Sequence, residues 1–162
     1  MKTLPGIVSL LLPLALAACA GMSGRPASVP TSLKTGQSWV VTRQPVAERV
    51  LDTCSRASPA RQPGRVSGYW APGPQQVDEL EARQQALAPT IASPQDYDRQ
   101  YVGVVVDGRR LIYINAFKLP DQSDIDPSRE AVVICDAGPR AWGALYDPQT
   151  GAFSEIEIDG TR

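Results

Sequence analysis

The chain has 162 residues, among them 16 lysines and arginines, 17 aspartates and glutamates, and no histidine. A formal net charge of −1 with no block of basic residues excludes the usual footprint of a nucleic-acid-binding protein. The missing histidine excludes Ser-His-Asp and Cys-His catalysis and the common zinc sites, so we expect a protein without a cofactor that is not an enzyme. Chemistry that uses paired carboxylates remains open.

The first residues have the pattern of an export signal. Lys2 is followed by an apolar stretch from Leu4 to Leu16, which is shorter than the roughly 20 apolar residues that a membrane-spanning helix needs. Its length and the small residues at its end are typical of the apolar region of a secretory signal. We therefore expect this segment to be removed from the mature protein.

The end of this segment, Leu16-Ala17-Ala18-Cys19, resembles the lipobox of bacterial lipoprotein precursors. The resemblance implies that the chain is cut before Cys19, that this thiol carries a diacylglyceryl group, and that the acyl chains anchor the protein to a membrane. Ala20 in the next position favours the outer membrane, with the domain facing the periplasm. The alternative is an ordinary secretory signal that is cut after an alanine, with Cys19 incidental.

This interpretation divides the chain into three parts. Residues 1–18 are the expected signal peptide, and residues 19–37 are a flexible tether that is rich in small residues and proline. Residues 38–162 form the expected single domain, since about this length of chain is enough for one domain with its own core.

Two cysteines, Cys54 and Cys135, are left once Cys19 is acylated. The oxidising environment of an exported protein favours a disulfide between them. Closing a loop of this size would stabilise the fold by roughly 4 to 5 kcal/mol in the chain-entropy model. The alternative is a pair of buried free thiols that behave as small apolar side chains.

Two helices are predicted in the first half of the domain, after a short strand at Ser38–Thr42. Pro45 suits the first turn of the first helix, and the apolar stripe behind it includes Cys54. An irregular connection rich in proline and glycine, residues 58–73, separates the two helices. The second helix begins at Pro74 and ends before Pro89.

The rest of the domain has the pattern of an antiparallel sheet. Asp107-Gly108 between two apolar runs is a strong hairpin signal. The strands expected here are residues 101–106, 110–117, 131–136, 142–146 and 153–158. In the last of these, Glu155 and Glu157 alternate with Ile156 and Ile158, which predicts one solvated face. The predicted fold class is therefore α+β, with two N-terminal helices packed on one face of an antiparallel meander sheet of about four or five strands. The first helix would carry Cys54 to a sheet strand that carries Cys135.

Residues 101–117, together with 133–136 and 146–148, are similar to uncharacterised small envelope proteins of Gram-negative bacteria. This resemblance implies a domain family and brings no activity with it. Candidate site residues therefore come from the pattern of polar and aromatic side chains alone.

Two groups of side chains are candidates for a ligand site. Asp136 and Arg140 flank a turn near Trp142, where they would line a small pocket or, alternatively, form an ion pair of little energetic value. Tyr69 and Trp70 would form a recognition patch with Trp142 if all three were exposed, because aromatic residues dominate interface hot spots. If they are buried, they belong to the core.

A third group lies in an acidic stretch, with carboxylates at Asp121, Asp124, Asp126 and Glu130. Calcium binds to several oxygen ligands from one bent loop, so these side chains are candidates. The glycine and the ligand spacing of an EF-hand are absent, and a solvated loop explains the same residues. We therefore expect no metal site.

The function that these observations favour is a lipid-anchored, non-enzymatic module that binds an envelope protein or a cell-wall component. One alternative is a carboxylate-dependent hydrolase that pairs Asp136 with Glu155 or Glu157, which requires about 5 to 9.5 Å between the two groups. Another alternative is an inhibitor of an exogenous enzyme, with residues 118–130 as a protruding loop.

Overall fold

The structure is a computed structural model that describes residues 36–160. The expected signal peptide, Cys19 and the tether up to residue 35 lie outside the described residues. The described chain has two α-helices and a six-stranded, mostly antiparallel sheet, which confirms the α+β class and adds to the predicted number of strands. In chain order the elements are β1 (Ser38–Val40), α1 (Gln44–Leu51), β2 (Val66–Trp70), α2 (Pro74–Arg83), β3 (Asp98–Val106), β4 (Arg109–Phe117), β5 (Ala141–Asp147) and β6 (Ala152–Ile158).

The sheet ends in two short strands at one edge and in a single longer strand at the other. From β3 to β6, each strand pairs antiparallel with the next along the chain. Two short strands share the outer edge of β3: β1 runs parallel beside its first half, and β2 runs antiparallel beside its second half. At the other end of the sheet, β6 has β5 as its single neighbour among the described strands.

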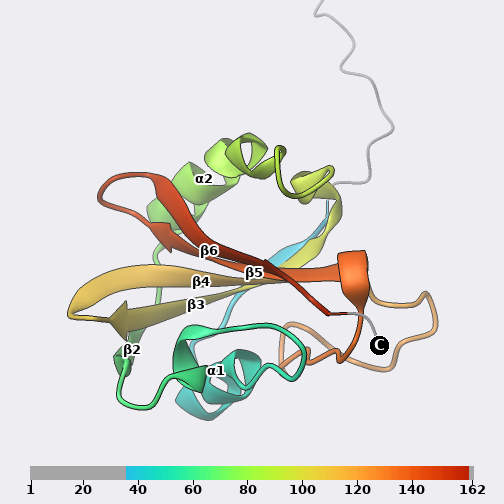
Figure 1. The fold of residues 1–162 in the computed structure, drawn as a ribbon, viewed down its shortest axis with the longest axis horizontal. Helices are drawn as coiled ribbons and strands as arrows, with labels where there is room; N and C mark the ends of the chain where they lie inside the picture. Colours follow the sequence, from blue (N-terminus) through green and yellow to red (C-terminus); the bar gives the residue numbers. More distant parts are fainter. Residues whose placement is uncertain (1–35, 161–162) are drawn as a thin grey trace, which may run out of the picture. The chain divides into compact units, whose positions relative to one another are not determined.

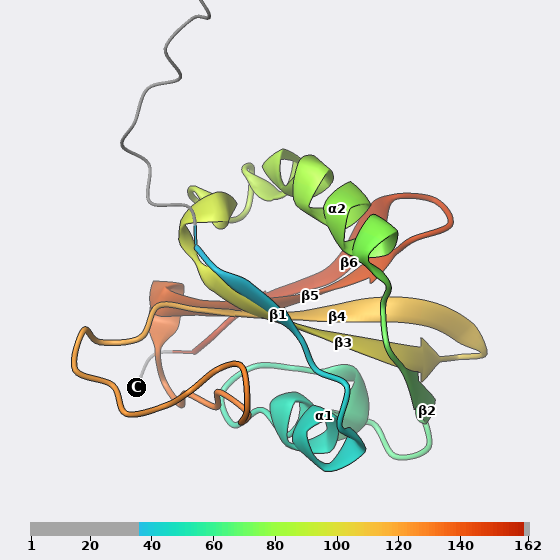
Figure 2. The ribbon, with the colours of Figure 1, turned by 180° about the vertical axis from the view of Figure 1, so that it is seen from behind.

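The two α-helices lie on opposite faces of the sheet, α2 above it and α1 below it in Figure 1 and in the reverse view of Figure 2. Side chains alternate between the faces, so Tyr101 packs with Leu80 of α2, while Val102 packs with Val50 of α1. The prediction that both helices cover one face is wrong. Every residue of β5 is buried, so the sheet needs a cover on each face.

The first helix ends at Leu51, so the predicted helical position of Cys54 is wrong. Hydroxyl side chains in the following turn bond to the backbone: Thr53 Oγ1 donates to the carbonyl oxygen of Arg56 at 2.6 Å, and Ser58 Oγ donates to that of Leu51 at 2.5 Å. Such local bonds offer the chain an alternative to further helical turns.

Residues 131–136 form no strand, contrary to the prediction. The backbone N–H of Val132 donates to Gln100 Oε1 at 3.0 Å, and Asn115 Nδ2 donates to the carbonyl oxygen of Val132 at 2.9 Å. Both side chains belong to paired residues of β3 and β4. The segment is therefore held across the α1 face of the sheet by side chains and does not pair at an edge.

Strand β2 lies where the sequence predicts an irregular connection. Its pairing depends on a glycine far along the chain: a Cβ at Gly103 would lie 2.1 Å from the carbonyl oxygen of Trp70. The sequence of residues 66–70 does not indicate that β3 has a glycine at the position where Trp70 packs. The pattern of these residues alone therefore predicts a loop.

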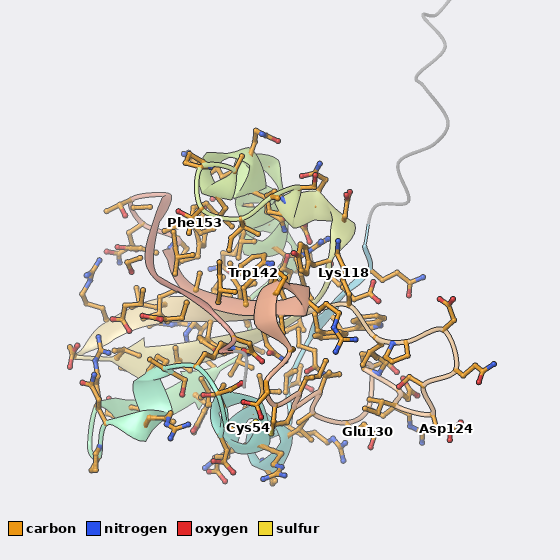
Figure 3. The ribbon with its side chains drawn as sticks, turned by 45° about the vertical axis from the view of Figure 1, so that its right-hand side comes forward. Cys54, Lys118, Asp124, Glu130, Trp142 and Phe153 are labelled. Carbon is orange, nitrogen blue, oxygen red and sulfur yellow. A yellow bond between two sulfur atoms is a disulfide. The ribbon has the colours of Figure 1, made fainter. Side chains whose placement is uncertain are left out.

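The expected disulfide between Cys54 and Cys135 is confirmed, with their Cα atoms 5.4 Å apart. Both cysteines are exposed, and Figure 3 labels Cys54 on the α1 side of the sheet. The bond joins the turn after α1 to residues 131–136, not a helix to a strand. It therefore fixes the long β4–β5 connection to the α1 layer.

Candidate functional site

A cleft of about 710 Å³ lies on the α1 side of the sheet, between residues 57–65 and the last strand. We call it the β6 cleft. Its charged lining consists of Arg65, Asp107, Glu155 and Glu157, which is three carboxylates and one guanidinium. Tyr113 also lines the cleft. Together with the four charged residues, it makes the lining mainly polar. Two of the carboxylates that the sequence singled out, Glu155 and Glu157, therefore meet at this site.

Arg65 connects the wall of the cleft to the sheet. Its Nη1 donates to Glu155 Oε2 at 2.9 Å, its Nη2 bonds to the other oxygen of Glu155, and its Nε donates to Asp107 Oδ2 at 3.2 Å. Hydrogen bonding to Glu155, and then to Asp107, raises the pKa of Arg65 above its ordinary value. The two-pronged contact holds the Glu155 carboxylate in one orientation.

Glu155 lies at an irregularity of β6. The register changes between Leu145, which pairs with Ser154, and Gly143, which pairs with Glu157, so β6 has one residue more than β5 in this stretch. Glu155 has a φ of 49°, in the left-handed region that few residues other than glycine occupy. The backbone and Arg65 together fix the side chain at the rim of the cleft.

Glu157 differs from its neighbour because, within residues 36–160, no lysine or arginine forms an ion pair with it. Its side chain is exposed and lines both the β6 cleft and an adjoining hollow of about 500 Å³. A charge with this placement attracts a cationic group without first having to break an internal bond.

Tyr113, which lines the cleft, belongs to a buried polar cluster. Arg56 Nε donates to the Tyr113 hydroxyl at 3.2 Å, Arg56 Nη1 donates to Asp159 Oδ1 at 2.5 Å, and Arg56 Nη2 bonds to Asn115 Oδ1. Space for this cluster depends on Gly143, where a Cβ would lie 2.5 Å from the Tyr113 hydroxyl and 2.9 Å from Arg56 Nε.

Protonation within this cluster follows from burial and charge. Burial raises the pKa of Tyr113, and the opposing effect of Arg56 does not cancel it. Burial disfavours the charge of Arg56, but Tyr113 and Asp159 outweigh that effect, so the pKa of Arg56 is raised. Tyr113 is therefore a neutral hydroxyl at ordinary pH, suited to hydrogen bonding and not to acting as a base.

The predicted group of Asp136, Arg140 and Trp142 does not form a pocket around the tryptophan. Trp142 is 1% exposed and packs edge-on against Tyr97 in the α2-side core, as its position in Figure 3 indicates. Arg140 is exposed at the end of a short 3-10 turn, and the backbone N–H of Asp136 donates to Ser55 Oγ at 2.9 Å.

Tyr69 and Trp70 lie on opposite faces of the sheet, so they form no common patch with Trp142. Tyr69 packs toward α1 and Trp70 toward α2. The indole Nε1 of Trp70 donates to two backbone carbonyl oxygens, those of Val104 at 3.1 Å and Leu111 at 3.2 Å. Most of the aromatic side chains that were candidates therefore help to hold the sheet.

Two acidic side chains of the β4–β5 connection, those of Asp126 and Glu130, bond within their own loop. Asp126 Oδ1 accepts the backbone N–H of Ser128 at 3.0 Å and its hydroxyl at 2.6 Å, and these bonds lower the pKa of Asp126. Glu130 Oε1 accepts the backbone N–H of Asp126 at 2.9 Å. Figure 3 shows Asp124 and Glu130 on this projecting loop, and the described residues contain no group of three or more potential metal ligands.

Sequence reasoning missed the groups that shape the β6 cleft. Arg56, Arg65 and Tyr113 stand in no motif, and Asp107 was noted only as a turn residue. They meet because the 53–65 loop folds over the sheet, which is a non-local arrangement. The one available signal was the alternation of glutamate and isoleucine in residues 155–158.

Comparisons of this chain with protein-family models, curated proteins and solved structures found no match. Within residues 36–160, neither helix has the length and apolar character needed to cross a membrane.

Proposed function

We propose that this chain is a lipid-anchored envelope protein whose domain, residues 38–162, binds a partner through the β6 cleft. The observation that carries the proposal is the open polar cleft, in which Arg65 orders two carboxylates and Glu157 has no ion-pair partner within residues 36–160. Fixed hydrogen-bonding groups around an accessible charge are what a recognition site requires. The partner is an envelope protein or a cell-wall component.

Binding accounts for the cleft better than hydrolysis does. A two-carboxylate mechanism needs one group that gives a proton and a second group that is available to act on water or substrate. Both oxygens of Glu155 bond to Arg65, and Asp136 is not among the residues that line the cleft. Of the predicted carboxylates, only Glu157 is then available in the cleft, and hydrolysis needs two.

Binding also accounts for the domain better than inhibition through a protruding loop. The end of the 118–130 loop is tied to the sheet, because Gln100 Nε2 donates to the carbonyl oxygens of Pro127 at 2.8 Å and Glu130 at 2.6 Å. Next to this attachment, the Ser128 hydroxyl donates to Asp126 Oδ1 within the loop itself at 2.6 Å. No group on this loop has the arrangement of a recognition site that the cleft has.

The proposed location of the protein rests on the lipobox resemblance at Leu16-Ala17-Ala18-Cys19. Two or more acyl chains hold a protein stably on a membrane, whereas one chain gives only marginal binding. Ala20 favours the outer membrane, with the domain in the periplasm, and the disulfide of Cys54 and Cys135 fits that oxidising compartment.

Replacing Cys19 with serine should release the protein from membranes. Because the thioether cannot form on serine, we expect most of the wild-type chain and almost none of the C19S chain in the washed membrane fraction. Intact-mass measurement of the wild-type protein should show diacylglycerol on Cys19. An unmodified Cys19 in protein taken from membranes would contradict the proposed anchor.

A photo-crosslinking amino acid in the β6 cleft should capture the partner. Gln62 is exposed and lines both the cleft and the adjoining hollow, so it is the position of choice. The matched control is Asp78, which is exposed on α2 at the opposite face. In the cells that naturally make the protein, we expect reproducible adducts from position 62 only. Equal adducts from both positions, or none from position 62, would rule out the cleft as the binding surface.

A further inference from the structure

The outer edge of β6 is an open sheet edge. Within residues 36–160, the backbone of residues 153–158 hydrogen-bonds to β5 and to no other segment. The opposite edge of the sheet is made of two short strands, with three residues in β1 and five in β2, whereas β6 has seven residues. A strand edge has N–H and C=O groups that point away from its neighbour and pair readily with an added strand.

The side chains along this edge alternate in character. Glu155 and Glu157 line the β6 cleft, while Ile156 packs against the α2-side core. Ile158 is 42% exposed and is one of two large apolar side chains that are exposed in the described part of the chain. An extended segment beside β6 would meet acidic and apolar positions in turn, because successive side chains of a strand point to opposite faces.

A second copy of this chain is a poor occupant of the edge. Two β6 strands side by side would bring the glutamates of one copy close to those of the other, and like charges across a strand pair are destabilising. The same carboxylates that oppose self-association attract a basic strand.

We propose that β6 pairs with an extended segment of a partner protein in which basic and apolar residues alternate. Backbone hydrogen bonds to the β6 edge would give affinity, as in other cases of strand addition. Basic side chains of the partner would reach Glu157 in the cleft, and its apolar side chains would lie along Ile156 and Ile158. The inference rests on the proposed function and narrows its partner to a polypeptide.

The test uses the mature protein, purified from membranes in detergent, and a blocked synthetic heptapeptide, Lys-Val-Lys-Val-Lys-Val-Lys. Hydrogen–deuterium exchange should slow in residues 152–158 when the peptide is added. Peptide affinity should fall about two- to fivefold in the Glu157→Gln variant, the range for an exposed charge pair, and further in Glu157→Lys. Asp78→Asn on α2 is the charge control and should bind the peptide as the wild type does.

Two further peptides separate strand addition from simple charge attraction. A block peptide of the same composition, Lys-Lys-Lys-Lys-Val-Val-Val, and an alternating peptide with N-methylated valines should both bind at least about fivefold more weakly. Binding that leaves exchange in residues 152–158 unchanged would overturn strand addition while leaving the cleft as a binding site. If the heptapeptide does not bind at all, strand addition by a basic segment is excluded, and adducts from position 62 in cells would still support the proposed function.

Discussion

Replacing Arg56 with methionine should lower the free energy of unfolding by about 3 to 5 kcal/mol, the range for removing one partner of a buried ion pair. The side chain of Arg56 is 4% exposed and that of its partner Asp159 is 0% exposed. The substitution leaves the Asp159 carboxylate buried without its cation, and it also removes hydrogen bonds to Tyr113 and Asn115. Chemical denaturation followed by tryptophan fluorescence measures the change.

The matched control is Arg49→Met, because Arg49 pairs with Asp52 at 2.8 Å while both side chains are largely exposed. An exposed pair contributes about 0 to 1 kcal/mol, so this variant should keep nearly all of the wild-type stability. A double variant, Arg56→Met with Asp159→Leu, should be less destabilised than the sum of its single changes, since no charge is left unpaired. Similar losses from the Arg49 and Arg56 variants would show that burial of the Arg56 pair has no energetic role.

The contrast between Arg49 and Arg56 shows why the sequence predicts the fold better than it predicts the site. The hairpin at Asp107-Gly108 and the helix that starts near Pro45 follow from local patterns, and both are present in the structure. The same local patterns give no reason to single out Arg56 from the other arginines. Its burial depends on the absence of a side chain at Gly143, which lies far along the chain on β5.

The errors in the predicted fold have a related cause. Residues 131–136 have the composition of a strand, but Gln100 and Asn115 on the sheet face bond to their backbone at Val132. The periodicity of a segment indicates which of its residues are apolar. It does not indicate whether the backbone of the segment hydrogen-bonds to a neighbouring strand or to polar side chains. The sequence shows only a glutamine beside one apolar run and an asparagine within another. That Gln100 and Asn115 are buried and lie opposite each other in adjacent strands was not predictable from the sequence.

Among the candidate site residues, Glu155 and Glu157 are the two that the structure places in the β6 cleft. Local alternation was enough to place both glutamates on a solvated side of the last strand. It did not separate their roles, because Arg65 reaches Glu155 from the loop that precedes β2, and nothing reaches Glu157 as an ion-pair partner within residues 36–160. That difference depends on three-dimensional contacts, and it carries the proposed binding site.

Replacing both Cys54 and Cys135 with alanine should lower the free energy of unfolding by about 2 to 5 kcal/mol, the range for removing a native disulfide from a small domain. The cysteines are 81 residues apart in the chain, so the disulfide restricts a large loop of the unfolded state. In the folded state it also fixes residues 131–136, which lie outside the ladder of the sheet, to the turn after α1. Denaturation of the double variant and of the oxidised wild type measures the difference.

Reduction of the wild-type protein should reproduce the effect of the double alanine variant. Because both cysteines are exposed, a reductant reaches the bond without prior unfolding. The reduced wild type and the variant should therefore unfold at the same denaturant concentration, and the variant should not respond to reductant. Faster hydrogen exchange should appear first in the 118–137 connection, where the lost restraint acts, and later in β3 and β4. If oxidised wild type and variant differ by less than about 1 kcal/mol, below the range typical of native disulfides, the bond does not restrain the unfolded chain as inferred.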